Sequence, residues 1–181
     1  MRLRGPSLFT IIFILAGLCI GDSSRASRDH GSNTAFQDGV AAQVMKIHDG
    51  DTLSVRIGGK TEKIRLIGID APEVGQRPWG EKAKRHLADL IGASDITIVT
   101  DVRKRDRYGR LLAYVWSTAG RLVNLEMVRD GYAVIYTVPP NVRHVDQLRA
   151  AQREAREKKR GIWAAGGLLE SPRDYRAGHP R

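Results

Sequence analysis

The feature that most constrains the fold is an apolar run over residues 64–70, followed almost at once by Pro72. β-branched and aliphatic residues dominate this run, which is typical of a strand, and Arg65 is embedded in it. Pro72 has no backbone N–H, so a strand ladder cannot continue through it. We predict a strand over residues 62–70, and its apolar residues on both faces are typical of a central barrel strand.

Hydrophobic periodicity extends this prediction along the chain. Strands are expected over residues 43–48, 53–57, 62–70, 96–102 and 110–116, and helices over residues 79–91, 123–130 and 145–159. Three strands, a helix and two strands is the order of an OB-type barrel. We therefore predict an α+β protein, mainly a β-barrel: an OB-fold five-stranded barrel with about three α-helices.

The N-terminal residues are typical of an export signal. Arg2 and Arg4 precede an apolar run over residues 8–20, which is short for a membrane span. We predict a signal peptide over 1–26, cleaved after Gly21 or Ala26. A flexible linker over 27–40, an OB-fold domain over 41–164 and a loose C-terminal tail over 165–181 follow.

The expected location is secreted or periplasmic, as a monomer without a stable membrane partner once the signal is removed. Two alternatives stay open: an uncleaved N-terminal anchor, and a lipid on Cys19, although bulky Leu18 precedes that cysteine. Cys19 is the one cysteine of the sequence. Export with cleavage would leave no thiol, no disulfide and no cysteine-ligated metal.

The charge of the chain indicates a polyanionic partner. Lys and Arg number 30 against 20 Asp and Glu, a formal net charge of +10. Removal of the signal would leave the chain strongly basic. Nucleic acid and an anionic membrane surface both suit such a charge, and the charge alone does not choose between them.

One acidic residue stands out by its register. Counting by twos from Val55 and Leu53 places Asp51 on the same inward face. A carboxylate on an apolar face is costly unless a cation or hydrogen-bond donors compensate it. Alternatively, Asp51 only serves the turn at Asp49 and Gly50.

Other charged residues are weak signals one by one and stronger together. Asp70 could simply end a strand, Glu73 could be solvated, and Arg110 could be a surface arginine. Simple alternation puts Arg65 and Asp70 on opposite faces, so they converge only if the strand ends, bulges or coils before Asp70. As a group, oxygen ligands without His or Cys suit a hard cation such as Ca²⁺ or Mg²⁺. Paired arginines suit a phosphodiester.

These residues resemble the staphylococcal nuclease (thermonuclease) family. The resemblance rests on residues 44–52, 64–73 and 106–115, and it extends through residues 122–131 and 159–163. It covers about residues 42 to 164, and several ordered motifs at matching separations make it specific.

The resemblance implies an OB-type barrel with calcium-dependent phosphodiesterase activity on DNA and RNA. By matching motifs, Asp51 and Asp70 would bind Ca²⁺, with the Ala71 backbone carbonyl as a further ligand. Ala71 stands where the best-known members carry Thr, and a carbonyl ligand survives that change. Glu73 would be the general base that acts on water.

The resemblance also implies substrate contacts. Arg65 and Arg110 would hold the scissile phosphate, and Tyr108 and Tyr136 would flank the terminal nucleotide. Tyr136 is assigned across a one-residue gap in the match. The sequence adds two basic residues, Arg107 and Lys104, as candidate nucleotide-binding residues.

The expected function is an exported calcium-dependent endonuclease of DNA, RNA or both. A catalytically inactive OB-fold module is the main alternative. It would bind nucleic acid through a basic and aromatic groove of Arg103, Lys104, Arg105, Arg107 and Tyr108. Binding alone does not require inward carboxylates facing a polyanion, which favours the enzyme. A membrane-surface protein, the third class, would explain neither acidic segment.

Overall fold

The computed structural model describes residues 39–93 and 95–180. The predicted signal peptide lies outside these residues, as does the predicted linker up to residue 38. Among the described residues, no helix combines the length and the apolar character needed to cross a membrane.

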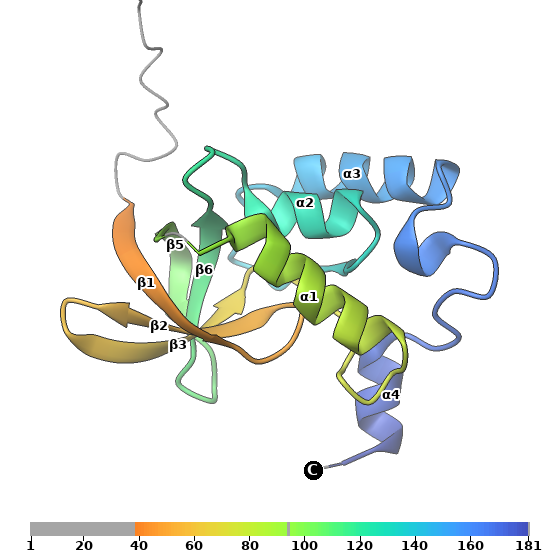
Figure 1. Ribbon diagram of the computed structural model, residues 1–181, viewed down its shortest axis with the longest axis horizontal. Helices are drawn as coiled ribbons and strands as arrows, with labels where there is room; N and C mark the ends of the chain where they lie inside the picture. Colours follow the sequence, from red (N-terminus) through yellow and green to blue (C-terminus); the bar gives the residue numbers. More distant parts are fainter. Residues whose placement is uncertain (1–38, 94, 181) are drawn as a thin grey trace, which may run out of the picture. The chain divides into compact units, whose positions relative to one another are not determined.

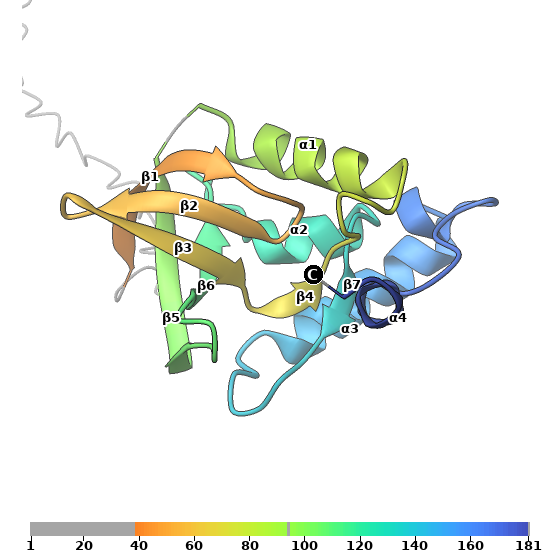
Figure 2. The same ribbon diagram turned by 90° about the horizontal axis from the view of Figure 1, so that it is seen from below.

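A closed five-stranded barrel forms the centre of the fold (Figure 2). Its strands are β1 (Val40–Ile47), β2 (Thr52–Ile57), β3 (Lys60–Leu66), β5 (Ile96–Arg105) and β6 (Leu111–Trp116), in the ring order β1-β2-β3-β6-β5. Neighbouring strands are antiparallel, except that β3 and β6 are parallel. This topology confirms the predicted α+β OB-type barrel.

The helices come from the chain between and after the strands (Figure 1). They are α1 (Trp79–Ile91), α2 (Val123–Arg129), α3 (Val145–Glu157), the 3₁₀ helix η2 (Gly161–Trp163) and α4 (Pro172–Gly178). Helix α2 lies against both α1 and α3. The apolar stripe predicted for α1 is buried, including Ala83 and Leu87 with no exposed surface.

The main core joins the inside of the barrel to the helices. Leu53, Val55 and Ile64 from the barrel, Leu87 from α1 and Met127 from α2 have no exposed surface. Burial of each such side chain stabilises the fold by about 1.5–3 kcal/mol. This core holds the barrel end that carries the charged residues.

The predicted single strand over residues 62–70 is wrong, because it breaks into β3 and β4 (Gly68–Asp70). Gly68 has a φ of 81°, a conformation that side chains disfavour, and a Cβ there would collide with Leu148. After the break, β4 leaves the barrel and pairs with β7 (Val134–Tyr136), a strand that periodicity did not predict.

A buried asparagine fastens this break to the barrel. Asn124 is fully buried in α2. Its Oδ1 accepts a hydrogen bond from the Val115 N–H at 2.9 Å, and its Nδ2 donates to the Ile67 carbonyl at 2.9 Å. Nδ2 also lies 3.3 Å from the Ala113 carbonyl. One side chain therefore ties α2, β6 and the β3–β4 junction together.

The prediction of a loose tail over 165–181 is also wrong for the described residues. Residues 172–178 form α4, and the Ser171 Oγ accepts a hydrogen bond from the Asp174 N–H at 3.1 Å. The tail also contacts the loop before α1, where the Gln76 Nε2 donates to the Glu170 carbonyl at 3.1 Å. A capped helix with tertiary contacts stabilises this segment against fraying.

Candidate functional site

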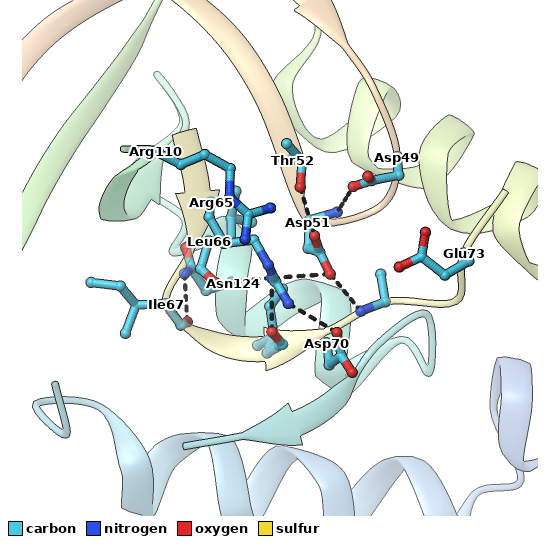
Figure 3. A network of polar contacts seen from close by, with 12 residues as sticks. Asp49, Asp51, Thr52, Arg65, Leu66, Ile67, Asp70, Glu73, Arg110 and Asn124 are labelled. Atoms are coloured by element: carbon cyan, nitrogen blue, oxygen red, sulfur yellow. Dashed lines mark hydrogen bonds and ion pairs between the residues drawn. The ribbon is translucent and has the colours of Figure 1, made fainter. Parts of the chain in front are cut away.

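Asp51 lies at the turn between β1 and β2, with its side chain surrounded by donors (Figure 3). It is 5% exposed, which confirms the burial predicted from its register. Its Oδ2 accepts from the Ala71 N–H at 2.7 Å and its Oδ1 accepts from the Thr52 hydroxyl at 2.9 Å. The Asp51 N–H donates to Asp49 Oδ1 at 3.0 Å. A buried carboxylate with these donors is held in one orientation.

Arg65 joins the two predicted ligand carboxylates. Its Nη1 lies 3.0 Å from Asp51 Oδ2, and its Nη2 lies 2.9 Å from Asp70 Oδ1. The Ile69 carbonyl accepts a further bond from Nη1 at 2.9 Å. The break at Gly68 therefore meets the condition under which Arg65 and Asp70 converge. Figure 3 shows the three charged side chains facing one another.

The carboxylates lie where negative charge is concentrated. Burial raises the pKa of Asp70 above its ordinary value, against the opposing effects of the Arg176 hydrogen bond and the Arg65 charge. Burial, and then the charge of Asp51, raises the pKa of Asp49 to about 6. A group of acids in such surroundings is stabilised by added positive charge.

Glu73 follows in the loop after β4. Its N–H donates to the Gln76 Oε1 at 2.9 Å, which fixes the backbone of the loop. Its side chain is 17% exposed. In Figure 3 the Glu73 carboxylate is directed toward Asp51. The predicted base and the predicted ligands therefore lie at the same end of the barrel.

Arg110 reaches this end of the barrel from the start of β6. The parallel pairing of β3 and β6 sets Ile64 opposite Leu111, so Arg110, the residue just before β6, lies beside the strand that carries Arg65. The Arg110 Nε donates to Asp106 Oδ2 at 2.7 Å. This ion pair leaves the outer nitrogens of the guanidinium as potential donors to an anion.

The predicted nucleotide-binding residues lie on exposed surfaces. Tyr108 is 67% exposed, and the Arg107 guanidinium lies 4.8 Å from its ring centre. Lys104 is exposed near the end of β5. Tyr136 is 43% exposed and pairs with Gly68 of β4, two residues before Asp70. Their proposed contact with a nucleotide stays a prediction.

Sequence reasoning missed one residue of the site, Arg176 of α4. Its Nη2 lies 2.8 Å from Asp70 Oδ2, and its Nη1 lies 3.0 Å from both Asp70 Oδ1 and Glu73 Oε1. The hydrogen bond with Asp70 raises the pKa of Arg176, so the guanidinium stays charged. Ser171 followed by Pro172 and Asp174 is a helix-start signal that could have revealed α4. It could not have revealed where the helix lies.

The oxygen atoms that could ligate a metal at this end of the barrel suit a hard cation bound by few protein groups. Within residues 39–93 and 95–180, no cluster of three or more His, Cys, Asp or Glu side chains is arranged to hold a metal. Asp51 and Asp70, however, both lie within 3.0 Å of one cationic group, the Arg65 guanidinium. Two carboxylates and a backbone carbonyl suit Ca²⁺ or Mg²⁺ when water and a substrate phosphate complete the coordination.

Comparisons with known proteins agree with this geometry. The family model described as "Staphylococcal nuclease homologue" matches residues 63–165. The chain is 35% identical over 128 residues to "Endonuclease YncB" of Bacillus subtilis, a match that covers 67% of this chain and 60% of that protein. The chain thus spans less than two thirds of that relative.

Two further relatives are covered more fully. The chain is 33% identical over 131 residues to "Thermonuclease" of Staphylococcus hyicus, which covers 67% of this chain and 75% of that protein. It is 38% identical over 125 residues to an "Uncharacterized endonuclease" of Escherichia coli O157:H7. That match covers 69% of this chain and 78% of that protein. With the matched barrel and the arrangement of its acids and arginines, these similarities show that the chain belongs to the staphylococcal nuclease family.

Proposed function

We propose that the chain is an exported, calcium-dependent endonuclease that hydrolyses phosphodiester bonds of DNA, RNA or both. The observation that carries the proposal is the bridge from Arg65 to Asp51 and Asp70, with Glu73 at the same end of the barrel. The names of the relatives, endonuclease and thermonuclease, support the same reaction class. The alternative of a purely binding OB module explains neither buried carboxylate.

The proposed ligands of the cation are the Asp51 and Asp70 carboxylates and the Ala71 carbonyl. Ca²⁺ bound there would supply positive charge to a phosphoryl oxygen. The Ala71 N–H already holds Asp51 Oδ2 at 2.7 Å, which orients this carboxylate before any ligand binds. Such preorganisation lowers the cost of reorganisation during the reaction.

Glu73 is the proposed general base. Its carboxylate accepts a proton from a water molecule as the water oxygen attacks phosphorus and the phosphorus–oxygen bond to the leaving nucleotide breaks. The leaving oxygen takes a proton from solvent water, and Glu73 returns its own proton to solvent. The hydrogen bond from its own N–H to Gln76 keeps the loop in place during this transfer. General base catalysis of this kind contributes about 10² to 10⁴ in rate.

Arg65 and Arg110 are the proposed phosphate ligands. A guanidinium carries five N–H donors. In Arg65, Nη1 donates to the Leu66 and Ile69 carbonyls and Nη2 donates to Asp70. The Nε–H and the second Nη2 hydrogen are the donors that we propose for a phosphate. Arg110 keeps its outer nitrogens for the same purpose while Asp106 holds its Nε.

The exposed residues beside the site are proposed to bind the rest of the strand. The rings of Tyr108 and Tyr136 offer stacking surfaces for bases, and Arg107 and Lys104 offer charge to the backbone. Stacking tolerates any base, so these contacts would impose little sequence preference.

A matched pair of variants tests the mechanism. Glu73→Gln keeps the size of the side chain and removes the proton acceptor, so saturated turnover on denatured DNA should fall about 10²- to 10⁴-fold. Lys104→Ala should weaken binding and flatten its salt dependence, with saturated turnover nearly unchanged. Equal turnover of the two variants, close to that of the parent enzyme, would rule out Glu73 as the base.

The metal assignment has its own test. Ca²⁺ should restore digestion after treatment with a chelator, and it should raise the thermal stability of the protein, because it binds the native state. Calorimetry that found no Ca²⁺ binding even with a nucleotide present would refute the calcium site.

Export is proposed from Arg2, Arg4 and the apolar run over residues 8–20. Cell fractionation and mass spectrometry of the N-terminus would test this proposal. A full-length chain in the cytoplasm with Met1 intact would overturn it.

A further inference from the structure

The C-terminal helix places an arginine against the carboxylates of the proposed cation site. The Arg176 fork binds both oxygens of Asp70, at 2.8 Å and 3.0 Å, and its Nη1 also lies 3.0 Å from Glu73 Oε1. The arrangement joins the proposed base to a proposed metal ligand through one positive charge. The roles proposed above for the other residues of the site do not explain why Arg176 contacts Asp70 and Glu73.

The geometry sets Arg176 in competition with a cation. Asp70 Oδ1 already accepts from Arg65 at 2.9 Å, so with Arg176 in place both oxygens of this buried carboxylate are engaged. A divalent ion binds a carboxylate through the same oxygen lone pairs. It also repels a guanidinium within hydrogen-bond distance of those oxygens. Arg65 donates to Oδ1 alone, whereas Arg176 also holds Oδ2 at 2.8 Å, so coordination of the cation through Oδ2 requires Arg176 to withdraw.

Helix α4 is held in a way that allows withdrawal. Pro172 is the one buried residue among residues 172–178, and the Arg176 side chain is 38% exposed. The Tyr175 hydroxyl lies against Gly75, where any Cβ would collide with it. Gln76 adds a single hydrogen bond to the Glu170 carbonyl. Few buried apolar contacts are typical of segments that open locally at low free-energy cost.

We propose that α4 is a removable cap, whose Arg176 guanidinium occupies the cation-binding face of Asp70 and is displaced when Ca²⁺ binds. The proposal rests on the cation site proposed above. In the capped state the protein cannot bind Ca²⁺ through the face of Asp70 that Arg176 occupies. The observed Ca²⁺ affinity is therefore the intrinsic affinity multiplied by the fraction of molecules in which α4 is open.

The expected effect follows from the strength of the contact. Asp70 is buried and the guanidinium fork engages both of its oxygens, which strengthens the ion pair, whereas exposure of Arg176 weakens it. We expect Arg176→Gln to bind Ca²⁺ about 5- to 30-fold more tightly than the parent protein. Glu73, the other partner of Arg176, remains in place in this variant.

Two further variants separate the cap from a general charge effect. Arg173→Gln removes the same charge from an exposed position of the same helix and should leave the Ca²⁺ affinity within about twofold. Gly75→Val keeps every charge but collides with Tyr175, so it should undock α4 and also tighten Ca²⁺ binding. Calorimetric titration with Ca²⁺ alone, on purified protein, compares the four proteins, and urea unfolding confirms that each is folded.

Hydrogen exchange gives a readout independent of affinity. A seven-residue helix is unstable once it leaves the protein, so the amides of α4 should lose protection when the parent binds Ca²⁺. In Arg176→Gln they should exchange rapidly even without Ca²⁺. Unchanged affinity in Arg176→Gln, or α4 amides that stay protected with Ca²⁺ bound, would overturn the cap. If the parent and all variants fail to bind Ca²⁺, the calcium site itself is refuted, and the proposed cap is refuted with it.

Discussion

Substitution of Asn124 by alanine should cost far more stability than the size of the side chain suggests. The parent side chain satisfies the buried Val115 N–H at 2.9 Å and the Ile67 carbonyl at 2.9 Å. Alanine leaves both groups without this partner in a place with no exposed surface. Each unsatisfied buried group costs about 1–3 kcal/mol, so the free energy of unfolding should fall by about 3–5 kcal/mol. That is a large part of the roughly 5–15 kcal/mol typical of a domain.

Urea titration followed by circular dichroism measures this loss. With a slope of about 2 kcal/mol per molar urea, the midpoint should fall by about 1.5–2.5 M while the slope stays the same. Asn141→Ala is a matched control, because Asn141 also makes two backbone hydrogen bonds, both to Arg103, at 2.8 Å each. Asn141 is buried, but Arg103 is exposed, so after truncation water can reach the freed Arg103 groups and the loss should be about 1–2 kcal/mol.

A loss below about 1 kcal/mol for Asn124→Ala would refute the reasoning, since it would mean that the β3–β4 junction does not depend on this side chain. A loss no larger than that of Asn141→Ala would refute it as well. A change in the slope itself would instead indicate an altered unfolded or native state.

Three other predictions follow from the same structure. Arg65→Lys keeps the charge but loses the planar fork, so saturated turnover should fall about 10²-fold or more in a nuclease assay, and parent-like turnover would contradict the phosphate role. Gly131 has a φ of 74° and a Cβ there would collide with the Arg160 carbonyl, so Gly131→Ala should lower the free energy of unfolding by about 2–4 kcal/mol in thermal unfolding. Burial and the Asp101 charge raise the pKa of Tyr114 to about 12. The folded protein then holds this proton more tightly than the unfolded chain, so about 2–3 kcal/mol of stability, present below pH 10, should be lost as the pH rises toward 12. Tyr114→Phe should lack this alkaline loss in urea unfolding across that pH range.

Sequence periodicity predicted the parts of the fold that depend on local spacing. Counting by twos from Leu53 placed Asp51 inside, and the helical spacing of Ala83 and Leu87 identified the buried face of α1. These predictions succeeded because each rests on the repeat of a single element. Such a repeat can be recognised from consecutive residues of the sequence alone.

Sequence periodicity could not predict features that depend on contacts between residues distant in the chain. The break at Gly68 places Arg65 beside Asp70, and it depends on Ile67 pairing with Ala113 and on Asn124. Strand β7 is three residues long and exists as a partner of β4. The contact of Arg176 with Asp70 spans 106 positions of the chain. A helix-start signal reveals a helix, and only tertiary packing determines what it touches.

The odd number of strands in the barrel has a consequence for where the charged residues can lie. Around a closed ring, each antiparallel step reverses the strand direction, and five reversals cannot return to the starting direction. At least one neighbouring pair must therefore be parallel, and here it is β3 with β6. Parallel neighbours cannot be joined by a tight hairpin, so other parts of the chain must lie between β3 and β6 in the sequence. Here they are the excursion that begins after β3, followed by β5. Asp70, Glu73 and α1 all lie on that excursion. The parity of the ring thus keeps β3 and β6 apart in the sequence, and the segment with Asp70 and Glu73 lies in the interval between them.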